Sequence, residues 1–334
     1  MSQRAELLDL LSGNKIDSQP AFSGLIHVTA EGLQSEGLIF HETHKDVGKM
    51  AKAAASTFKL SGIPSAVLPL DMYVEAEALG AEINFRENSE FEFPQVSKAG
   101  LFGSAKDLTA EITKGKEFLN EGRIKVVCDG IKLLKEDVGN DVVIGGLIPG
   151  PYTLLLLVAD VKKMFIEMKK EPQAVTDALI HLSSFLAEIG TAYKNAGADF
   201  ITIHDMGGSP AFIGPTKYEQ FVWPAEKLLI EKLPKPRVLS VCGNVTSSLH
   251  LLSQTGADAI SIDQTVDLAA ARLALKDTLL FGNLDPVETL YRGDEARVRG
   301  SVVRAKEAGV DAIWPGCDLV PQTPIQNIKT LLQI

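Results

Sequence analysis

The segment Val238-Leu-Ser-Val-Cys-Gly-Asn244 is a short apolar run that ends in a cysteine followed by a glycine. A second cysteine ends a similar run near the other end of the chain, in Trp314-Pro-Gly-Cys317. In a parallel sheet, a residue in this position lies where the strand stops and a loop begins. We therefore expect Cys242 and Cys317 to lie together at one mouth of a parallel sheet.

Apolar runs alternate with helical patterns on both sides of this segment. The helical patterns carry ordinary boundary signals, such as Pro172 in a first turn and Gly197 just beyond a helix end. Eight apolar runs can be counted, and they begin near Ala21, Ala66, Val142, Phe200, Val238, Ala259, Leu279 and Ala312. Eight strand-helix units predict an α/β fold, the (β/α)8 TIM barrel, with an open doubly wound sheet as the alternative. We expect residues 1–334 to form a single barrel domain with an N-terminal helical extension.

Composition argues against several classes of partner. The formal net charge is -10, from 43 acidic and 33 basic residues, whereas nucleic acids and anionic membranes need a basic footprint. The only long uncharged run, residues 142–159, is interrupted by glycines and prolines, so it reads as a strand, a turn and a helix rather than a membrane span. The glycine motifs of nucleotide-binding loops are missing as well. A small-molecule substrate is therefore expected.

The three cysteines are Cys128, Cys242 and Cys317, which cannot form a closed set of disulfides. The first residues lack the apolar core of a signal peptide, so we expect a cytoplasmic location. Cys128 lies in a helical pattern and is expected in the core. For Cys242 and Cys317 the alternative to a metal site is also a place in the core, because a buried cysteine is usually a small core residue.

Polar residues gather where the predicted strands end. They are Asp71, His204, Asp205, Ser240, Cys242, Asp263, Asn283, Asp285 and Cys317. In a (β/α)8 barrel the carboxyl ends of all strands meet at the face that carries the active site. The candidate catalytic residues are Asp71, His204 and Asp205, although His204 and Asp205 are equally consistent with a structural hydrogen bond. Asp285 is expected to cap the next helix.

Six different short motifs follow one another along most of the chain. They are Pro69-Leu-Asp-Met-Tyr-Val-Glu-Ala-Glu-Ala-Leu-Gly80, Gly150-Pro-Tyr-Thr153, Cys242-Gly-Asn244, Ser261-Ile-Asp-Gln264, Gly282-Asn-Leu-Asp-Pro286 and Gly316-Cys317 with Thr323-Pro324 behind it. Together they resemble the uroporphyrinogen decarboxylase superfamily and, within it, the methylcobamide:coenzyme M methyltransferases. The resemblance implies a barrel with its active site at the strand ends. The candidate substrate-binding residues are Tyr152, Ser240, Asn244, Gln264 and Asn283.

Two features separate the branches of this superfamily. The decarboxylases carry an arginine-bearing segment near the N-terminus that binds substrate carboxylates, whereas residues 21–45 hold no arginine. The methyltransferases carry a zinc motif, His-x-Cys with a distant Cys. Ser240-Val-Cys242 and Cys317 supply both cysteines, with serine where the histidine would be. The resemblance therefore favours the methyltransferase branch with an altered metal motif.

The altered motif bears on the chemistry that the resemblance implies. In that branch zinc holds the acceptor thiol as the thiolate, the form that attacks the methyl group. Serine is a poor zinc ligand because its hydroxyl stays protonated, so Asp263 or His204 would complete the site with Cys242 and Cys317. Alternatively the metal is absent and the acceptor is a tetrahydrofolate-type amine, with Asp205 handling its proton.

The sequence thus predicts a methyltransferase that moves a methyl group from a methyl-Co(III) corrinoid (methylcobalamin) to a thiol such as coenzyme M, or to an amine. The corrinoid would arrive on a separate carrier protein, because the chain lacks the Asp-x-His-x-x-Gly segment of such carriers. Zinc is a candidate cofactor and a homodimer a candidate assembly. Two alternatives stay open, a uroporphyrinogen decarboxylase-type lyase and a non-catalytic barrel that binds a corrinoid or its carrier.

Overall fold

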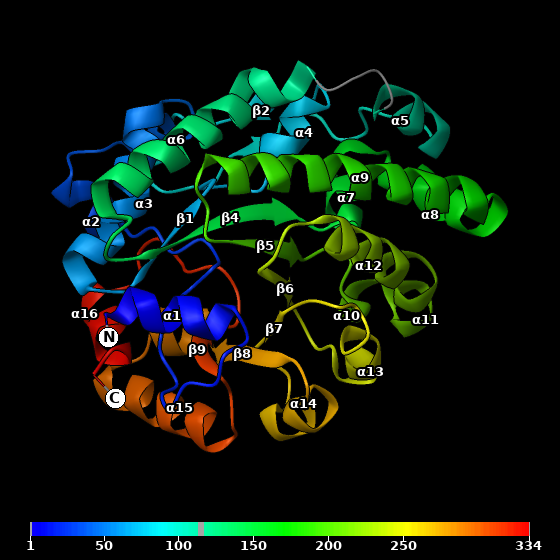
Figure 1. The fold of residues 1–334 in the computed structure, drawn as a ribbon. Coiled ribbons are helices and arrows are strands. Elements are labelled where there is room, and N and C mark those ends of the chain that lie inside the picture. Colours follow the sequence, from blue (N-terminus) through cyan, green and yellow to red (C-terminus); the bar gives the residue numbers. More distant parts are fainter. Residues whose placement is uncertain (1, 113–116, 334) are drawn as a thin grey trace.

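A curled parallel sheet of seven strands forms the centre of the computed structural model, which describes residues 2–112 and 117–333 (Figure 1). The ends of the predicted domain, Met1 and Ile334, lie outside the described residues. The strands are β1 (Ser65–Leu68), β4 (Val143–Pro149), β5 (Phe200–Asp205), β6 (Arg237–Val241), β7 (Ala259–Ile262), β8 (Leu279–Leu284) and β9 (Ala312–Pro315). Their spatial order is their chain order, as successive strand-helix units require. Seven of the eight predicted strands are therefore confirmed.

The eighth predicted segment, near Ala21, lies between β9 and β1 without forming a regular strand. Ala21 makes a single parallel bridge with Ile313 of β9. On the other side the Ser23 amide donates to the Ser65 hydroxyl of β1, at 3.0 Å. The sheet therefore closes like a barrel, but one bridge and a side-chain hydrogen bond replace a strand at the seam.

Aromatic rings fill the barrel below its mouth. Phe22 packs edge-on against Trp314 and Phe281, with ring centroids 5.1 and 5.5 Å away, and Phe281 lies 5.0 Å from Trp314. Gly24 passes so close to Trp314 that a side chain would overlap the indole ring. Because alternate residues of a strand share a face, the residues that follow these rings along each strand line the mouth above them.

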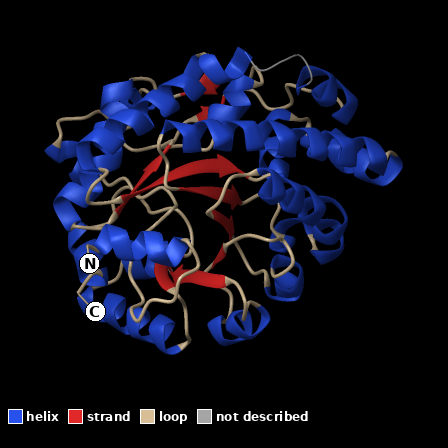
Figure 2. Cartoon of the chain, viewed as in Figure 1, coloured by secondary structure: helices blue, strands red, loops and turns tan. Residues whose placement is uncertain are grey.

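Helices cover the outside of the sheet (Figure 2). They are α1 (Gln3–Leu11), α2 (Ala30–Ser35), α3 (Val47–Ser61), α4 (Val74–Ala78), α5 (Ala105–Ile112), α6 (Gly122–Val138), α7 (Pro151–Val158), α8 (Val161–Lys170), α9 (Pro172–Ala196), α10 (Pro210–Ile213), α11 (Pro215–Lys217), α12 (Trp223–Lys232), α13 (Leu249–Leu252), α14 (Leu268–Ala274), α15 (Glu295–Glu307) and α16 (Ile325–Leu331). A two-stranded hairpin, β2 (Ile83–Asn84) and β3 (Gln95–Val96), stands apart from the sheet. Among the described residues, no helix combines the length and the apolar character that crossing a membrane requires.

Candidate metal centre at the barrel mouth

Three strands bring two cysteines and a histidine together at the carboxyl ends of the sheet. Cys242 directly follows β6, Cys317 lies two residues beyond β9, and His204 is near the end of β5. The two sulfur atoms are 2.8 Å apart, longer than the ~2.05 Å of a disulfide bond. The Nε2 atom of His204 lies 3.9 Å from Cys242 Sγ and 3.8 Å from Cys317 Sγ. We call these three residues the ligand cluster.

The histidine of the cluster stands directly beside Ser240. His204 and Ser240 are register partners on β5 and β6. Ser240 is buried, and its hydroxyl has no hydrogen-bond partner among the described residues. Neighbouring strands lie only ~4.8 Å apart, so a side chain from either position can reach the same point above the sheet. The structure therefore supplies a histidine from β5 next to the position where the related motif has one on β6.

A carboxylate and the two thiols set the charges of the ligand cluster. Burial alone would lower the pKa of His204, but Asp318, whose Oδ2 lies 3.5 Å from Nε2, and Cys317 together raise this pKa to about 10. A hydrogen bond from Cys242 lowers the pKa of Cys317 to about 6, and the same contact raises the pKa of Cys242. Asp318 is itself fixed by the Ile26 amide, at 2.8 Å. Asp318 and Cys317 therefore favour the charged form of His204, and Cys242 favours the charged form of Cys317.

The donor set of the ligand cluster fits zinc. The imidazole nitrogen and the two sulfurs all lie within 4.8 Å of one another, and no other group of three His, Cys, Asp or Glu side chains in residues 2–112 and 117–333 meets this condition. Two thiolates and an imidazole are typical ligands of zinc. Three protein ligands also leave a fourth position for a small molecule, as in catalytic zinc sites.

Asp263, which the sequence offered as a metal ligand, lies beside the cluster with its oxygens already occupied. Oδ2 accepts from the Gly243 amide at 2.8 Å. Oδ1 accepts from the Thr265 amide at 2.8 Å and from the Thr265 hydroxyl at 2.7 Å. The structure does not bring Asp263 into the group of three ligand atoms. Its carboxylate instead fixes the turn that follows Cys242.

The candidate substrate-binding asparagines hold loops at the same mouth. The Asn283 amide donates to the carbonyls of Asp263 and Val266, at 3.1 and 3.0 Å. The exposed Asn244 donates to the Thr265 carbonyl at 3.2 Å. Both side chains therefore tie the β6, β7 and β8 loops to one another, which keeps the loop next to Cys242 in place.

Three other predicted residues differ in their surroundings. Gln264 is exposed and lies against Gly316, next to Cys317. Tyr152 is fully buried in α7, and its hydroxyl contacts the Met168 sulfur at 3.6 Å, so it faces the core. Asp285 accepts from two amides of the following turn, both at 2.8 Å, which confirms the expected cap.

Asp205 follows His204 directly and therefore points to the other side of β5. It is fully buried, and its Oδ1 accepts from the Thr153 hydroxyl at 2.5 Å and from the Gly208 amide at 2.7 Å. Burial raises the pKa of Asp205, although these hydrogen bonds act against the shift. The structure thus places Asp205 between β5 and α7 rather than among the ligand atoms.

Asp71, three residues beyond β1, is paired with partners that sequence reasoning missed. It accepts from His44 Nδ1 at 2.8 Å, from two nitrogens of Arg123 at 2.6 and 3.2 Å, and from the Tyr73 amide at 2.9 Å. Burial alone would raise the pKa of Asp71, but Arg123 and His44 hold it well below its usual range. We call Asp71, His44 and Arg123 the ion-pair cluster. An acid at the end of an apolar strand signals that a partner is needed, but not that α6 supplies it.

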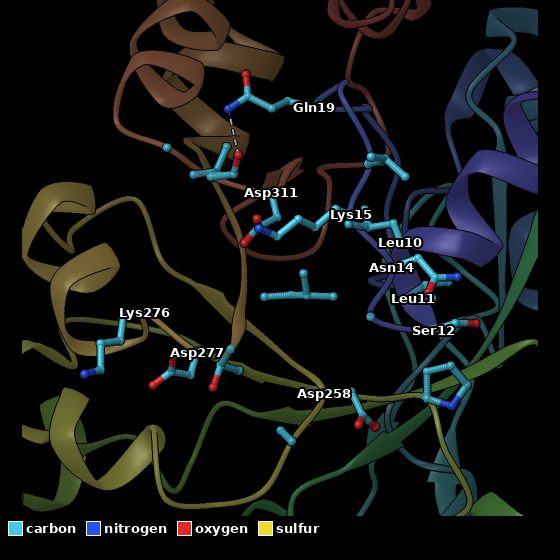
Figure 3. A pocket seen from close by; sticks show the side chains of 18 of the residues that line it. Leu10, Leu11, Ser12, Asn14, Lys15, Gln19, Asp258, Lys276, Asp277 and Asp311 are labelled. Carbon is cyan, nitrogen blue, oxygen red and sulfur yellow. Dashed lines mark hydrogen bonds between the residues drawn. The ribbon is translucent and has the colours of Figure 1, made fainter.

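Another hollow opens at the opposite end of the barrel. It is a cleft of about 1270 Å³ near the amino ends of β6 to β9, lined by residues such as Lys15, Asp258 and Lys276 (Figure 3). Several of its charges are paired with each other: Lys235 with Asp258 at 3.0 Å, and Arg272 with Asp311 at 2.7 Å. The cleft contains neither cysteine nor histidine. Its lining therefore offers no counterpart of the ligand cluster.

A parallel barrel with a soft three-ligand donor set at its carboxyl end defines a barrel enzyme whose active face is the mouth. Residues 2–334 match the sequence model of the uroporphyrinogen decarboxylase (URO-D) family, and the chain belongs to this family. This confirms the resemblance and, with it, the barrel-like fold inferred from the sequence.

The chain is similar over its full length to methyltransferases of this family. It is 30% identical to the methylcobamide:CoM methyltransferase MtbA of Methanosarcina acetivorans, over 99% of this chain and 96% of that protein. It is 30% identical to the methylcobamide:CoM methyltransferase MtaA of Methanosarcina barkeri, over 98% and 96%. A solved structure, a methyltransferase from Methanosarcina mazei, superposes with a TM-score of 0.93 at 29% identity, over 99% of this chain and 97% of that chain. These relatives favour the methyltransferase branch.

Proposed function

We propose that this protein transfers a methyl group from a methylated corrinoid, bound to a separate carrier protein, to a thiol acceptor at the ligand cluster. The observation that carries the proposal is the convergence of His204, Cys242 and Cys317 at the mouth, at 2.8 to 3.9 Å from one another. The names of the full-length relatives, methylcobamide:CoM methyltransferases, support the same reaction class.

In this proposal His204, Cys242 and Cys317 hold a zinc ion. When bound, zinc lowers the pKa of the acceptor thiol, so that the thiolate is available at neutral pH. The protein's own residues keep this site in shape. Asp263 fixes the Gly243 turn after Cys242, and Asp318 accepts the Ile26 amide beside Cys317. Their hydrogen bonds hold the chain next to the ligating cysteines in place before the substrates arrive.

The proposed step is an in-line displacement at the methyl carbon. The acceptor thiol releases its proton to solvent, and a sulfur electron pair forms the new sulfur-carbon bond. The cobalt-carbon bond breaks with both of its electrons left on cobalt, so Co(III) becomes Co(I) and the acceptor becomes a methyl thioether. The barrel contributes by holding the acceptor at a fixed point on the mouth, because positioning of two reactants lowers the entropic part of the barrier.

We also propose that the protein works in the cytoplasm. All three cysteines are free thiols, and two of them are only 2.8 Å apart. Thiols at this distance persist in a reducing compartment, where disulfides are rare.

The test is a turnover assay with free methylcobalamin as donor. We expect loss of methylcobalamin and formation of a methyl thioether with coenzyme M, together with about one zinc per chain in the purified protein. Turnover with tetrahydrofolate but not with coenzyme M would reject the thiol acceptor. Release of CO2 from uroporphyrinogen, without methyl transfer to either acceptor, would favour the decarboxylase alternative instead.

A further inference from the structure

Phe212 is an aromatic ring that the fold holds out toward solvent at the mouth. It lies on α10, directly after β5, and 69% of its surface is exposed. Its neighbours Pro210 and Ile213 are buried, and the Ser209 hydroxyl accepts the Ala211 amide at 3.2 Å. The turn is therefore anchored on both sides of the ring. The exposure of Phe212 follows from the shape of the turn and not from a loose segment.

The ring borders the turn that carries a cysteine of the ligand cluster. Gly243 follows Cys242 and has a φ of 79°, which favours glycine. A Cβ atom on Gly243 would lie 3.0 Å from Ala211 Cβ and 3.9 Å from Phe212 Cε2, so α10 and this turn are in close contact. The hydrogen bond from the Gly243 amide to Asp263 fixes the turn from its other side. Phe212 therefore has a defined position beside the Gly243 turn that follows Cys242.

Other apolar side chains are exposed elsewhere, and their exposure needs no special explanation. Leu273, on α14, is 81% exposed. Single apolar residues of this kind are common on protein surfaces. Phe212 differs because it lies next to a residue of the proposed site, in contact with the turn that positions it. Leu273 is thus a matched control of similar exposure.

We propose that Phe212 is the apolar seat on which the corrin ring rests during methyl transfer, an inference that rests on the proposed function. An in-line transfer requires the line from cobalt through the methyl carbon to the acceptor sulfur to be straight, so the ring plane lies across this line. The macrocycle is much wider than the ligand cluster and must extend over the rim beside it. A rigid aromatic side chain at the rim gives the corrin ring an apolar contact, and no flexible side chain has to become ordered on binding.

The first measurement is binding, which does not depend on turnover. Hydroxocobalamin is titrated into the purified protein, and its dissociation constant is measured by equilibrium dialysis. We expect Phe212→Ala to raise this constant about tenfold or more, because a buried aromatic contact is lost. Phe212→Tyr keeps the ring and should stay within about twofold of the wild-type protein. Leu273→Ala should bind as the wild type does.

The second measurement distinguishes an effect on corrinoid binding from an effect on the thiol acceptor. With methylcobalamin and coenzyme M, Phe212→Ala should raise the KM for methylcobalamin about tenfold, while the KM for coenzyme M and the zinc content stay unchanged. Equal binding by Phe212→Ala and the wild type, or an equal loss in Leu273→Ala, would overturn the inference. If the wild type binds hydroxocobalamin through Phe212 but transfers no methyl group, the proposed function fails and the seat stands. If the wild type does not bind it at all, both fail.

Discussion

The ligand cluster and the ion-pair cluster lie at the carboxyl ends of the same sheet, yet they differ in how their polar atoms are used. In the ion-pair cluster, Asp71 accepts four hydrogen bonds and faces the opposite charge of Arg123. In the ligand cluster, two sulfurs and the Nε2 of His204 face one another, and the carboxylate of Asp318 lies 3.5 Å from this nitrogen. The Asp71 carboxylate is fully paired within the protein, whereas the ligand cluster has the composition of a set of metal ligands.

The difference shows why a strand-end position is not enough to identify a reactive group. A carboxylate whose oxygens are already bonded to a guanidinium and an imidazole has little capacity left to bind a metal or accept a proton. Its lowered pKa expresses the same fact. The two thiols contact each other and His204, which are groups that a single ion could join. We therefore expect substitutions in the two clusters to separate activity from stability.

The largest expected effect comes from Cys317→Ala, which should lower both the zinc content and the turnover rate. Loss of one of three ligands should reduce the zinc content from about one per chain to near zero and reduce turnover more than about a hundredfold. Cys128→Ala is the control, because it removes a thiol on α6 that is not part of the ligand cluster. This variant should keep both its zinc and its turnover. Zinc content and turnover are measured on the same preparations. Unchanged zinc in Cys317→Ala would reject the ligand cluster as a metal centre.

The second prediction tests which strand supplies the histidine. His204→Ala should weaken zinc binding by about a hundredfold, because an imidazole ligand is lost. Ser240 is the register partner of His204, so adding Ser240→His to this variant should restore part of the affinity from the neighbouring strand. Zinc affinity is measured by competition with a chelator. If His204→Ala keeps full affinity, the third ligand is another group.

A substitution in the ion-pair cluster should instead lower the free energy of unfolding. Asp71→Asn leaves the buried Arg123 guanidinium without its main counter-charge, and we expect a loss of about 3–5 kcal/mol in the free energy of unfolding. Urea unfolding measures this loss. The zinc content of the folded fraction should match that of the wild type, since Asp71 is bound to Arg123 and His44 rather than to the sulfurs. A stable variant that has lost its zinc would remove the distinction between the clusters.

The sequence predicted the strands that carry both clusters better than it predicted which residues make up each cluster. Apolar runs that alternate with helical patterns located seven strands, because each of these patterns is local. The seam near Ala21 was mistaken for a strand, because its apolar residues fill the barrel while its backbone pairs through a single bridge. Cys242 and Cys317 stood out through their flanking glycines.

The partners of these residues were harder to predict, because they depend on register and on distant helices. His204 reaches the cysteines only because β5 and β6 align it with Ser240. Arg123 comes from α6, 52 residues after Asp71, and a lone arginine in a helical pattern usually indicates a solvated face. Asp205 shares its strand end with His204 but points the other way. These assignments require coordinates.

The smallest expected effect concerns a buried acid next to the ion-pair cluster. Burial raises the pKa of Glu75 to about 8, helped by the nearby Asp71 charge. Above its unfolded pKa, the folded state then binds more protons than the unfolded state, so stability should fall as pH rises, by about 1–3 kcal/mol between pH 5 and pH 7. Glu75→Gln keeps the acceptor that faces Tyr193 and removes this titration, so its unfolding free energy should fall by about 1–3 kcal/mol less than that of the wild type over this range. Urea titrations at several pH values measure the slope. The same slope in both proteins would mean that Glu75 ionises in its usual range in the folded protein.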